Sequence, residues 1–317
     1  MKKKFLISFI ISFICFGVIF SGLNKLGVFK ERSTEAMEGL EDDIDFGEGN
    51  EVKQKVKNEI LFLLMGVDAK DVKKSKGTRS DTMMLFRVNF DTGQINMLSI
   101  PRDTRVLVKG KEDKINHAHA YGGPALTLKS LRDFLNLDID YYVKVDYKAV
   151  MEIVDEIGGV EIDVPRNMKY KDPYADPPLN INIKKGLQTL DGKNSHDFLR
   201  WRHNNDYTSG YAEGDIGRIG AQQMFMKEFI KQTLKLKNIA KLPKFVETYY
   251  TYVETNISLD IMVKGAFAAK KIDIENMKTN TIPGVGERIA GTDYWIYNRE
   301  ETSAIVQEMF GDYLLSQ

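Results

Sequence analysis

The 317-residue chain has one cysteine, two tryptophans and a formal net charge of +0 at neutral pH. A single cysteine cannot form an intramolecular disulfide, and it excludes zinc modules built from several cysteines. The 45 Lys and Arg residues balance 45 Asp and Glu residues, which argues against a protein that coats nucleic acid by charge alone. Because 43% of the residues are hydrophobic, disorder over most of the length is also excluded.

Several catalytic motifs are absent as well. The sequence contains no Gly-x-Ser-x-Gly elbow, no His-Glu-x-x-His zinc helix and no Gly-x-x-x-x-Gly-Lys-Ser/Thr phosphate loop. His117 and His119 have the spacing of metal ligands, but no third ligand accompanies them. We therefore do not favour a metal site at this pair.

The N-terminal segment has the features of a membrane anchor. Residues 5–24 carry no charge, and about 20 helical residues span roughly 30 Å of hydrocarbon. The alternative is a cleaved signal peptide, whose apolar region runs only about 7–15 residues before a small-x-small site. Ser21-Gly22-Leu23 is a poor site of that kind. We predict an uncleaved transmembrane anchor over 5–24, with residues 1–4 in the cytoplasm and the body outside the cell.

The charges that follow the anchor are strongly segregated. Between Glu31 and Glu51 there are nine acidic residues and one base, and no sustained apolar face. We predict that residues 25–57 form an extracellular acidic linker and that 58–317 form one extracellular catalytic domain. From Val52 onward the chain is mildly basic, at about +3.

The body begins with patterns typical of β-strands. Ile60–Met65 is a short apolar run, as expected of a strand buried on both faces. Met83–Phe90 and Ile95–Ile100 are two further strand candidates, and Asp91-Thr92-Gly93-Gln94 between them predicts a hairpin turn.

Helices and strands then alternate along the chain. Further strands are predicted over Tyr141–Val145, Val160–Val164, Lys278–Ile282 and Tyr294–Tyr297. Helices are predicted over Pro124–Leu135, Lys148–Ile157, Asp191–Trp201, Ile216–Lys235, Leu259–Lys271 and after Asn298, its N-cap. We expect Asn167–Asn182 to be a long surface loop and Asn204–Gly214 a mobile polar one. The order of elements predicts an α/β fold, a layered α-β-α sandwich with a mixed central sheet.

Arginines and aspartates are concentrated where predicted strands and loops end. Ligands in open α/β sheets bind beyond the carboxyl ends of the strands, which favours Asp68 and Arg102 as site residues. Taken singly, each arginine is better explained by an ordinary surface ion pair. The candidate set is Asp68, Arg79, Asp81, Arg102, Arg200, Arg202, Arg218 and Gln222.

Taken together, these segments resemble the LytR-CpsA-Psr family over roughly residues 58–240. The matching segments are Gly66-Val67-Asp68, Arg79-Ser80-Asp81-Thr82, Ser99 to Thr104, Lys114-Ile115-Asn116, Arg200-x-Arg202 and Asp215-x-Gly217-Arg218-x-x-x-Gln222. The resemblance implies a phosphotransferase that moves a glycopolymer from undecaprenyl pyrophosphate to the muramyl C6 hydroxyl of peptidoglycan in a Gram-positive envelope. The family often has a second arginine where Ala221 stands here, which bears on the local phosphate contacts.

The candidate residues can be given roles in such a reaction. Phosphoryl transfer depends mainly on positioning and electrostatics, and an arginine fork holds two phosphate oxygens at once. We assign Asp68 and Asp81 to Mg²⁺, with Mn²⁺ as a substitute, because Mg²⁺ prefers one or two carboxylates plus phosphate oxygens. Five arginines and Gln222 are assigned to the pyrophosphate: Arg79, Arg102, Arg200, Arg202 and Arg218. Asp68, Arg79, Asp81 and Arg102 form the expected catalytic group. The general base remains open, and Asp68 is one candidate.

The lipid donor adds a further expectation, and two other functions stay open. A polyprenyl chain must be covered, because an exposed CH₂ group costs about 0.8 kcal/mol in water. We therefore expect an apolar channel between sheet and helices. The partners are the lipid-linked glycopolymer, peptidoglycan and the cell membrane, and no nucleic acid. The alternatives are a lipid pyrophosphate hydrolase and a non-catalytic envelope regulator that binds polyprenyl phosphates.

Overall fold

The computed structural model describes residues 58–67, 69, 72–75, 77–175, 178–207, 209–211, 215–235 and 252–315. The predicted cytoplasmic tail, anchor and linker all lie outside these residues. Among the helices that the structure does describe, none is both long and apolar enough to cross a membrane.

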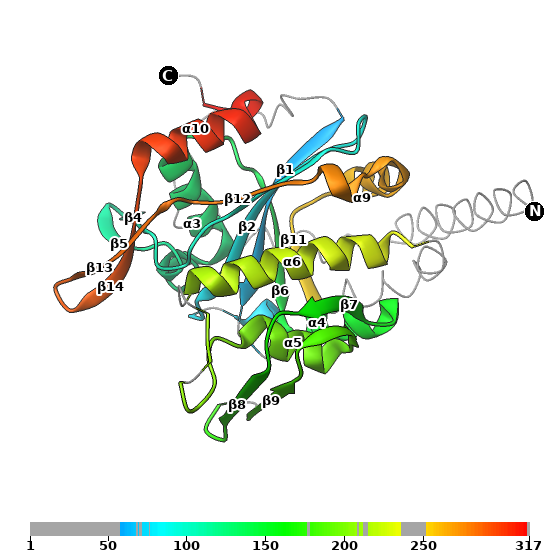
Figure 1. Ribbon diagram of the computed structural model, residues 1–317. Coiled ribbons are helices and arrows are strands. Elements are labelled where there is room, and N and C mark those ends of the chain that lie inside the picture. The colour runs from blue at the N-terminus through cyan, green and yellow to red at the C-terminus, as the bar shows by residue number, and fades with distance from the viewer. Residues whose placement is uncertain are drawn as a thin grey trace, which may run out of the picture. The chain divides into compact units, whose positions relative to one another are not determined.

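A six-stranded mixed sheet forms the centre of the fold, in the order β11-β6-β1-β2-β3-β12 (Figure 1). β1 is parallel to β6 and antiparallel to β2, β2 is antiparallel to β3, β3 is parallel to β12, and β11 is antiparallel to β6. The bounds of these strands are β1 Glu59–Val67, β2 Ser80–Asn89, β3 Ile95–Ser99, β6 Tyr141–Asp146, β11 Val253–Thr255 and β12 Lys278–Thr281. The predicted α/β class with a mixed central sheet is confirmed.

Helices pack on both faces of this sheet, and alternate residues of β1 therefore belong to two different hydrophobic clusters. Leu61, Leu63 and Met65 pack with residues of α3 and α10, whereas Phe62 and Leu64 pack with residues of α6. Figure 1 shows α6 crossing the sheet on one side. The helices are α3 His117–Leu135, α4 Tyr147–Ile157, α5 Gly192–Arg200, α6 Asp215–Thr233, α9 Leu259–Ala268 and α10 Arg299–Phe310. Asn298 caps α10 as predicted, because its side chain accepts a hydrogen bond from the Glu301 N–H.

Short elements complete the described part of the chain. Four 3-10 turns cover Val72–Lys74, Ala269–Lys271, Ile274–Asn276 and Gly311–Tyr313. Eight further strands form two-stranded pairs: β4 Arg105–Val108 with β5 Lys111–Lys114, β7 Val160–Val164 with β10 Gly186–Leu190, β8 Met168–Asp172 with β9 Leu179–Ile183, and β13 Gly284–Ile289 with β14 Thr292–Tyr297.

The prediction of a surface loop over Asn167–Asn182 is wrong, because β8 and β9 pair there as an antiparallel hairpin. Leu179, Ile181 and Ile183 are buried in alternation with exposed asparagines, which is the period-two pattern of a half-buried strand. Prolines and aspartates in the intervening turn obscured that pattern. The hairpin helps to build a second core with α4, α5, α6 and β7.

The loop after α5, predicted to be polar and mobile, makes hydrogen bonds to the β8–β9 hairpin. The Asn204 Oδ1 atom accepts a hydrogen bond from the Lys169 N–H at 2.8 Å, and the Asn205 Oδ1 atom accepts one from the Lys171 N–H at 2.6 Å. The two asparagine side chains thus accept hydrogen bonds from two backbone N–H groups of β8. The described part of this loop is therefore held against the β8–β9 hairpin.

The turn between β2 and β3 gives a test of the fold. Gly93 has φ +77°, and a Cβ atom there would lie 2.1 Å from the Lys271 carbonyl oxygen. We expect Gly93→Ala to lower the free energy of unfolding by more than about 2 kcal/mol, since strain in the left-handed region adds to a backbone collision. Urea unfolding followed by circular dichroism measures this.

Gly110 provides the matched control for that substitution. It has a similar φ of +75°, but a Cβ atom there would meet nothing within 4 Å. Gly110→Ala should therefore lower the free energy of unfolding only by the cost of the left-handed backbone conformation, about 1 kcal/mol. Equal losses at the two positions would contradict the predicted collision with Lys271.

Candidate functional site

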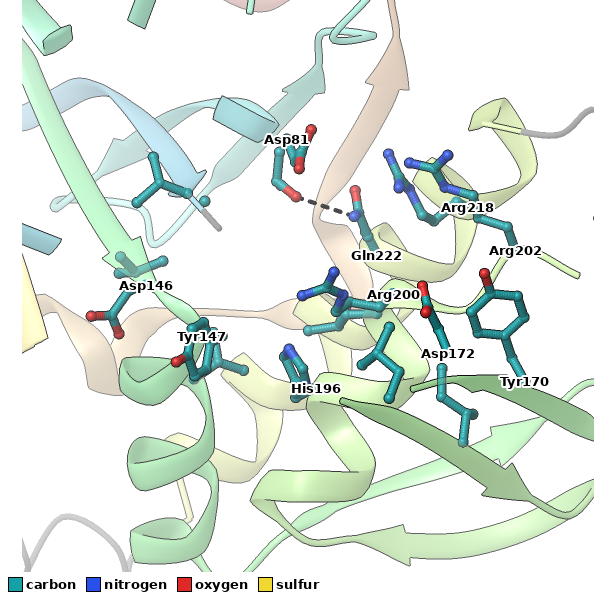
Figure 2. Close-up of a pocket in the computed structure, with 18 of the residues that line it drawn as sticks. Asp81, Asp146, Tyr147, Tyr170, Asp172, His196, Arg200, Arg202, Arg218 and Gln222 are labelled. Carbon is teal, nitrogen blue, oxygen red and sulfur yellow. Dashed lines mark hydrogen bonds between the residues drawn. The ribbon is translucent and has the colours of Figure 1, made fainter. Parts of the chain in front are cut away.

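A cavity of about 380 Å³ lies at the carboxyl ends of the parallel strands β1 and β6. Gly66 and Val67 of β1 and Val145 and Asp146 of β6 line it, and residues of α4, α5, α6, β8 and β9 supply the other walls (Figure 2). This volume is within the usual range of small-molecule sites. The position agrees with the expectation that the ligand binds beyond the strand ends.

Three arginines from two segments reach this cavity. Arg200 is the last residue of α5, Arg202 follows it two residues later, and Arg218 lies in the first turn of α6. Trp201 between the first two is extended and almost completely buried, with 1% of its surface exposed. Successive residues of extended backbone point to opposite sides, so burying Trp201 in the second core leaves its two neighbours at the cavity. The three side chains gather beside Gln222 (Figure 2).

Arg218 is positioned by a close contact between the loop and α6. A Cβ atom at Gly217 would lie 2.4 Å from Cβ of Tyr211, so only glycine lets the tyrosine pack against the first turn of the helix. The Tyr211 ring also packs edge-on against Trp201, at 5.0 Å between centroids. Burial raises the pKa of Tyr211 to about 12, although the charges of Arg166 and Arg218 oppose the rise. Tyr211 is therefore neutral at physiological pH and adds no negative charge beside Arg218.

A β-bulge directs Asp81 into the cavity. Gly66 pairs with Thr82 and Val67 pairs with Ser80, so Asp81 has no partner on β1. Such bulges locally redirect side chains and are common beside active sites.

Asp81 and Gln222 are each fixed by a neighbouring side chain. Oδ1 of Asp81 accepts a hydrogen bond from Nη1 of Arg102 at 2.6 Å. Gln222 lies one helical turn beyond Arg218 and donates to Oγ1 of Thr82 at 3.1 Å. The adjacent Gln223 faces away from the site and donates to three oxygens on β3 and β12.

The remaining predicted residues have different placements. Arg102 does not line the cavity itself, but it donates a hydrogen bond to Asp81, which does. Arg79 is exposed and outside the lining, and its charge acts on Tyr121. Because Asp81 is bulged, the simple alternation that would place Arg79 on the same side as Asp81 does not hold. Asp68 lies outside the described residues. Its assignment and that of Arg79 to the site remain predictions.

The carboxylates on the cavity wall offer few free ligands for Mg²⁺. Asp146 is already occupied, because its oxygens accept hydrogen bonds from the Ala149 N–H at 2.8 Å and the Val72 N–H at 3.1 Å. No group of three or more His, Cys, Asp or Glu side chains able to hold a metal occurs in the described part of the chain. Asp81 and Asp172 also lie on the wall, and each has one oxygen already engaged, by Arg102 and by the Tyr174 N–H respectively. The donor set thus fits a cation shared with phosphate oxygens better than a closed protein site.

Sequence reasoning missed six polar or aromatic residues that line the cavity. They are Asp146, Tyr147, Tyr170, Asp172, His196 and His203. The alternation of β8 could have identified Tyr170 and Asp172. His196 precedes Arg200 by four residues, so a helix over Asp191–Trp201 already places the two side chains on one face.

The two histidines considered for a metal are held by other contacts. Nδ1 of His117 lies 2.8 Å from Oδ1 of Asp113, and Nδ1 of the buried His119 lies 2.7 Å from the Thr78 carbonyl oxygen. Burial lowers the pKa of His119, which keeps this ring neutral. One nitrogen of each ring is therefore engaged by a neighbouring residue.

This chain is similar to known proteins over most of its length. The sequence profile of the LytR_cpsA_psr family matches residues 28–311. The polyisoprenyl-teichoic acid–peptidoglycan teichoic acid transferase TagU of Bacillus subtilis (strain 168) is 28% identical over 315 residues, covering 97% of this chain and 96% of that protein.

Two solved structures share the fold. The crystal structure of B. subtilis TagV has a TM-score of 0.68 at 27% identity, covering 83% of this chain and 100% of that chain. The structure of TagT bound to LIIa-WTA has a TM-score of 0.64 at 25% identity, covering 84% and 95%. Since the family profile spans most of the sequence, this protein belongs to the LytR-CpsA-Psr family.

Proposed function

We propose that this protein is a phosphotransferase that moves a glycopolymer from a polyprenyl pyrophosphate to peptidoglycan. The observation that carries the proposal is the convergence of Arg200, Arg202 and Arg218 on one cavity at the strand ends. Family membership and the name of the TagU relative, a teichoic acid transferase, support it.

The charge of the cavity suits a pyrophosphate diester. Each guanidinium stays protonated and can hold two phosphate oxygens in one plane. Arg218 is only 6% exposed, so its charge is poorly screened by water and acts strongly on a bound anion. Gln222 adds an amide donor beside it. These groups would neutralise the charge that grows on the bridging oxygen as the pyrophosphate bond breaks.

Apolar side chains also line the same cavity, as a lipid donor requires. They are Val67, Val145, Val150, Leu179, Ile181 and Leu199. These side chains would cover the first isoprene units next to the pyrophosphate. The long apolar channel expected from the sequence remains a prediction.

The reaction proposed is an in-line transfer. The acceptor hydroxyl, which we take to be the C6 hydroxyl of a muramyl residue, attacks the phosphorus that carries the sugar. An oxygen–phosphorus bond forms, the bridging bond breaks, and polyprenyl phosphate leaves with the electron pair. Asp81, together with Asp68, would hold Mg²⁺, which would supply further charge neutralisation on the phosphate oxygens. With residues 5–24 as a membrane anchor, the domain would act at the outer surface of the cell membrane.

Arg200 tests the role of the guanidinium fork. We expect Arg200→Lys to lower kcat/KM by roughly 100-fold, because an ammonium keeps the charge but cannot hold two oxygens in one plane. The measurement uses the full-length protein in detergent, a defined lipid-linked donor and peptidoglycan fragments. Free polymer as the product, in place of polymer linked to peptidoglycan, would identify a hydrolase instead.

The control for this substitution is Arg288→Lys. Arg288 lies on the β13–β14 hairpin, and 69% of its side chain is exposed. Its substitution should leave both transfer and the melting temperature unchanged. An Arg200→Lys protein with wild-type kcat/KM would remove the argument from bidentate binding.

Asp81 tests the metal assignment. We expect Asp81→Asn to raise the Mg²⁺ concentration needed for half-maximal transfer by about tenfold or more, because the carboxylate is replaced by a neutral amide. The Asp81–Arg102 pair is partly exposed, so the free energy of unfolding should fall by no more than about 1 kcal/mol. Asp163→Asn, on the exposed side of β7, is the matched control. An unchanged Mg²⁺ titration in Asp81→Asn would exclude Asp81 as a ligand.

A further inference from the structure

His196 lines the cavity but has no part in the phosphate binding assigned to the arginines. It lies on α5, four residues before Arg200, and its ring packs beside Tyr147 at 5.5 Å between centroids. Figure 2 shows it between Tyr147 and Arg200. Although it lines the cavity, only 8% of its surface is exposed.

The two ring nitrogens of His196 have different surroundings. Nδ1 lies 3.5 Å from Oδ1 of Asp197, whereas Nε2 is buried and has no hydrogen-bond partner among the residues that the structure describes. An ionised carboxylate only accepts hydrogen bonds, so the neutral ring carries its proton on Nδ1. Nε2 is then left with a lone pair and no protein donor, in a side chain that forms part of the cavity wall. This nitrogen is therefore able to accept a hydrogen bond or a proton from a group bound in the cavity.

Asp197 is well suited to support a charged imidazole. It is 3% exposed, and its other oxygen lies 2.6 Å from Nζ of Lys193. Burial alone would raise the pKa of the Asp197 carboxyl, but hydrogen bonds from His196 and Lys193 hold it below the ordinary value. The carboxylate therefore remains ionised beside the ring.

We propose that His196 is the general base of the transfer reaction and that Asp197 positions it. This inference rests on the proposed function. The proton of the acceptor hydroxyl moves to Nε2 as the oxygen–phosphorus bond forms and the bridging bond breaks. The electron pair of the broken bond leaves with polyprenyl phosphate. Asp197 stabilises the imidazolium, which later releases its proton to water.

The carboxylates described on the cavity wall are less suited to this role. Asp81 is held by Arg102 at 2.6 Å, and both oxygens of Asp146 accept backbone N–H groups. Oδ1 of Asp172 accepts from the backbone N–H groups of Tyr174 and Ala175 in the β8–β9 turn. Each of these carboxylates already has at least one oxygen engaged by a hydrogen bond or ion pair, and at Asp146, where burial raises the pKa, both oxygens are engaged.

Other charged and titratable groups share the cavity with His196. Apart from the occupied Asp146, they come from α4, α5 and its C-terminal extension, α6, β8 and β2: Tyr147, Arg200, Arg202, His203, Arg218, Tyr170, Asp172 and Asp81. The residues of β9 in the lining, Leu179 and Ile181, are apolar. His203 is a second imidazole in the same cavity, so it is the loss of the acidic limb in His196→Gln that assigns the limb to His196.

The test is the pH dependence of transfer by the full-length protein. In the wild type, kcat should rise with pH over an acidic limb and then level off, because only the neutral ring accepts a proton. His196→Gln should lower kcat by about 100-fold or more and remove this acidic limb, while KM for the donor changes little. Asp197→Asn should reduce kcat with the same donor KM.

Two further measurements separate catalysis from structure. Added imidazole should partly restore transfer to His196→Gly, which a purely structural role would not allow. His117→Gln is the control, since His117 also pairs with an aspartate, at 2.8 Å, but lies outside the cavity lining. It should keep the wild-type rate and acidic limb.

The outcomes separate this inference from the proposed function. Wild-type transfer together with an unchanged rate and acidic limb in His196→Gln would overturn the base assignment and leave the phosphotransferase intact. Failure of imidazole rescue in a folded His196→Gly protein that binds donor would also overturn it. Absence of transfer by the wild-type protein would overturn both proposals.

Discussion

Three positive charges held at one cavity wall are the constraint on which the rest of the site depends. Arg200, Arg202 and Arg218 repel one another, and burial of Arg218 makes that repulsion stronger than it would be in water. The protein can hold them together only if the segments that carry them are fixed by other contacts. Trp201 is buried between two of the arginines, and Tyr211 packs on both Trp201 and the glycine that precedes the third. The aromatic packing therefore fixes the segments that carry the three arginines beside the cavity.

Much of the central sheet could be predicted because its signals are local. The turn around Gly93 and the capping asparagine at 298 specify the neighbouring elements through backbone conformation and hydrogen bonding. Spacing also indicated parts of the site: Arg200-x-Arg202 reflects the extended residue between them, and Gly217 before Arg218 reflects the contact with Tyr211. Each of these relations extends over a few residues of sequence.

The features that sequence could not provide depend on pairing between distant strands. The bulge that isolates Asp81 exists only in the register of β2 against β1, so the different placements of Arg79 and Asp81 were not predictable from their spacing. The β8–β9 hairpin was missed because turn residues outnumber apolar ones in that stretch, although Leu179, Ile181 and Ile183 alternate. That error also removed Asp172 and Tyr170 from the candidate site. A short strand is recognised by what it packs against, which a single sequence does not give.

The chemistry of the cavity requires two kinds of group, and the fold separates them. Guanidinium groups neutralise phosphate charge but cannot accept a proton at physiological pH. Asp81, Asp146 and Asp172 each accept a hydrogen bond or ion pair from a neighbouring group, and burial raises the pKa of Asp146. His196 differs from them, because its Nε2 atom has no hydrogen-bond partner among the described residues. Asp197 lies 3.5 Å from Nδ1 of His196, where its carboxylate would stabilise a positive charge on the ring. Helix α5 can thus contribute both a phosphate-binding arginine and a proton acceptor, one turn apart on the same face.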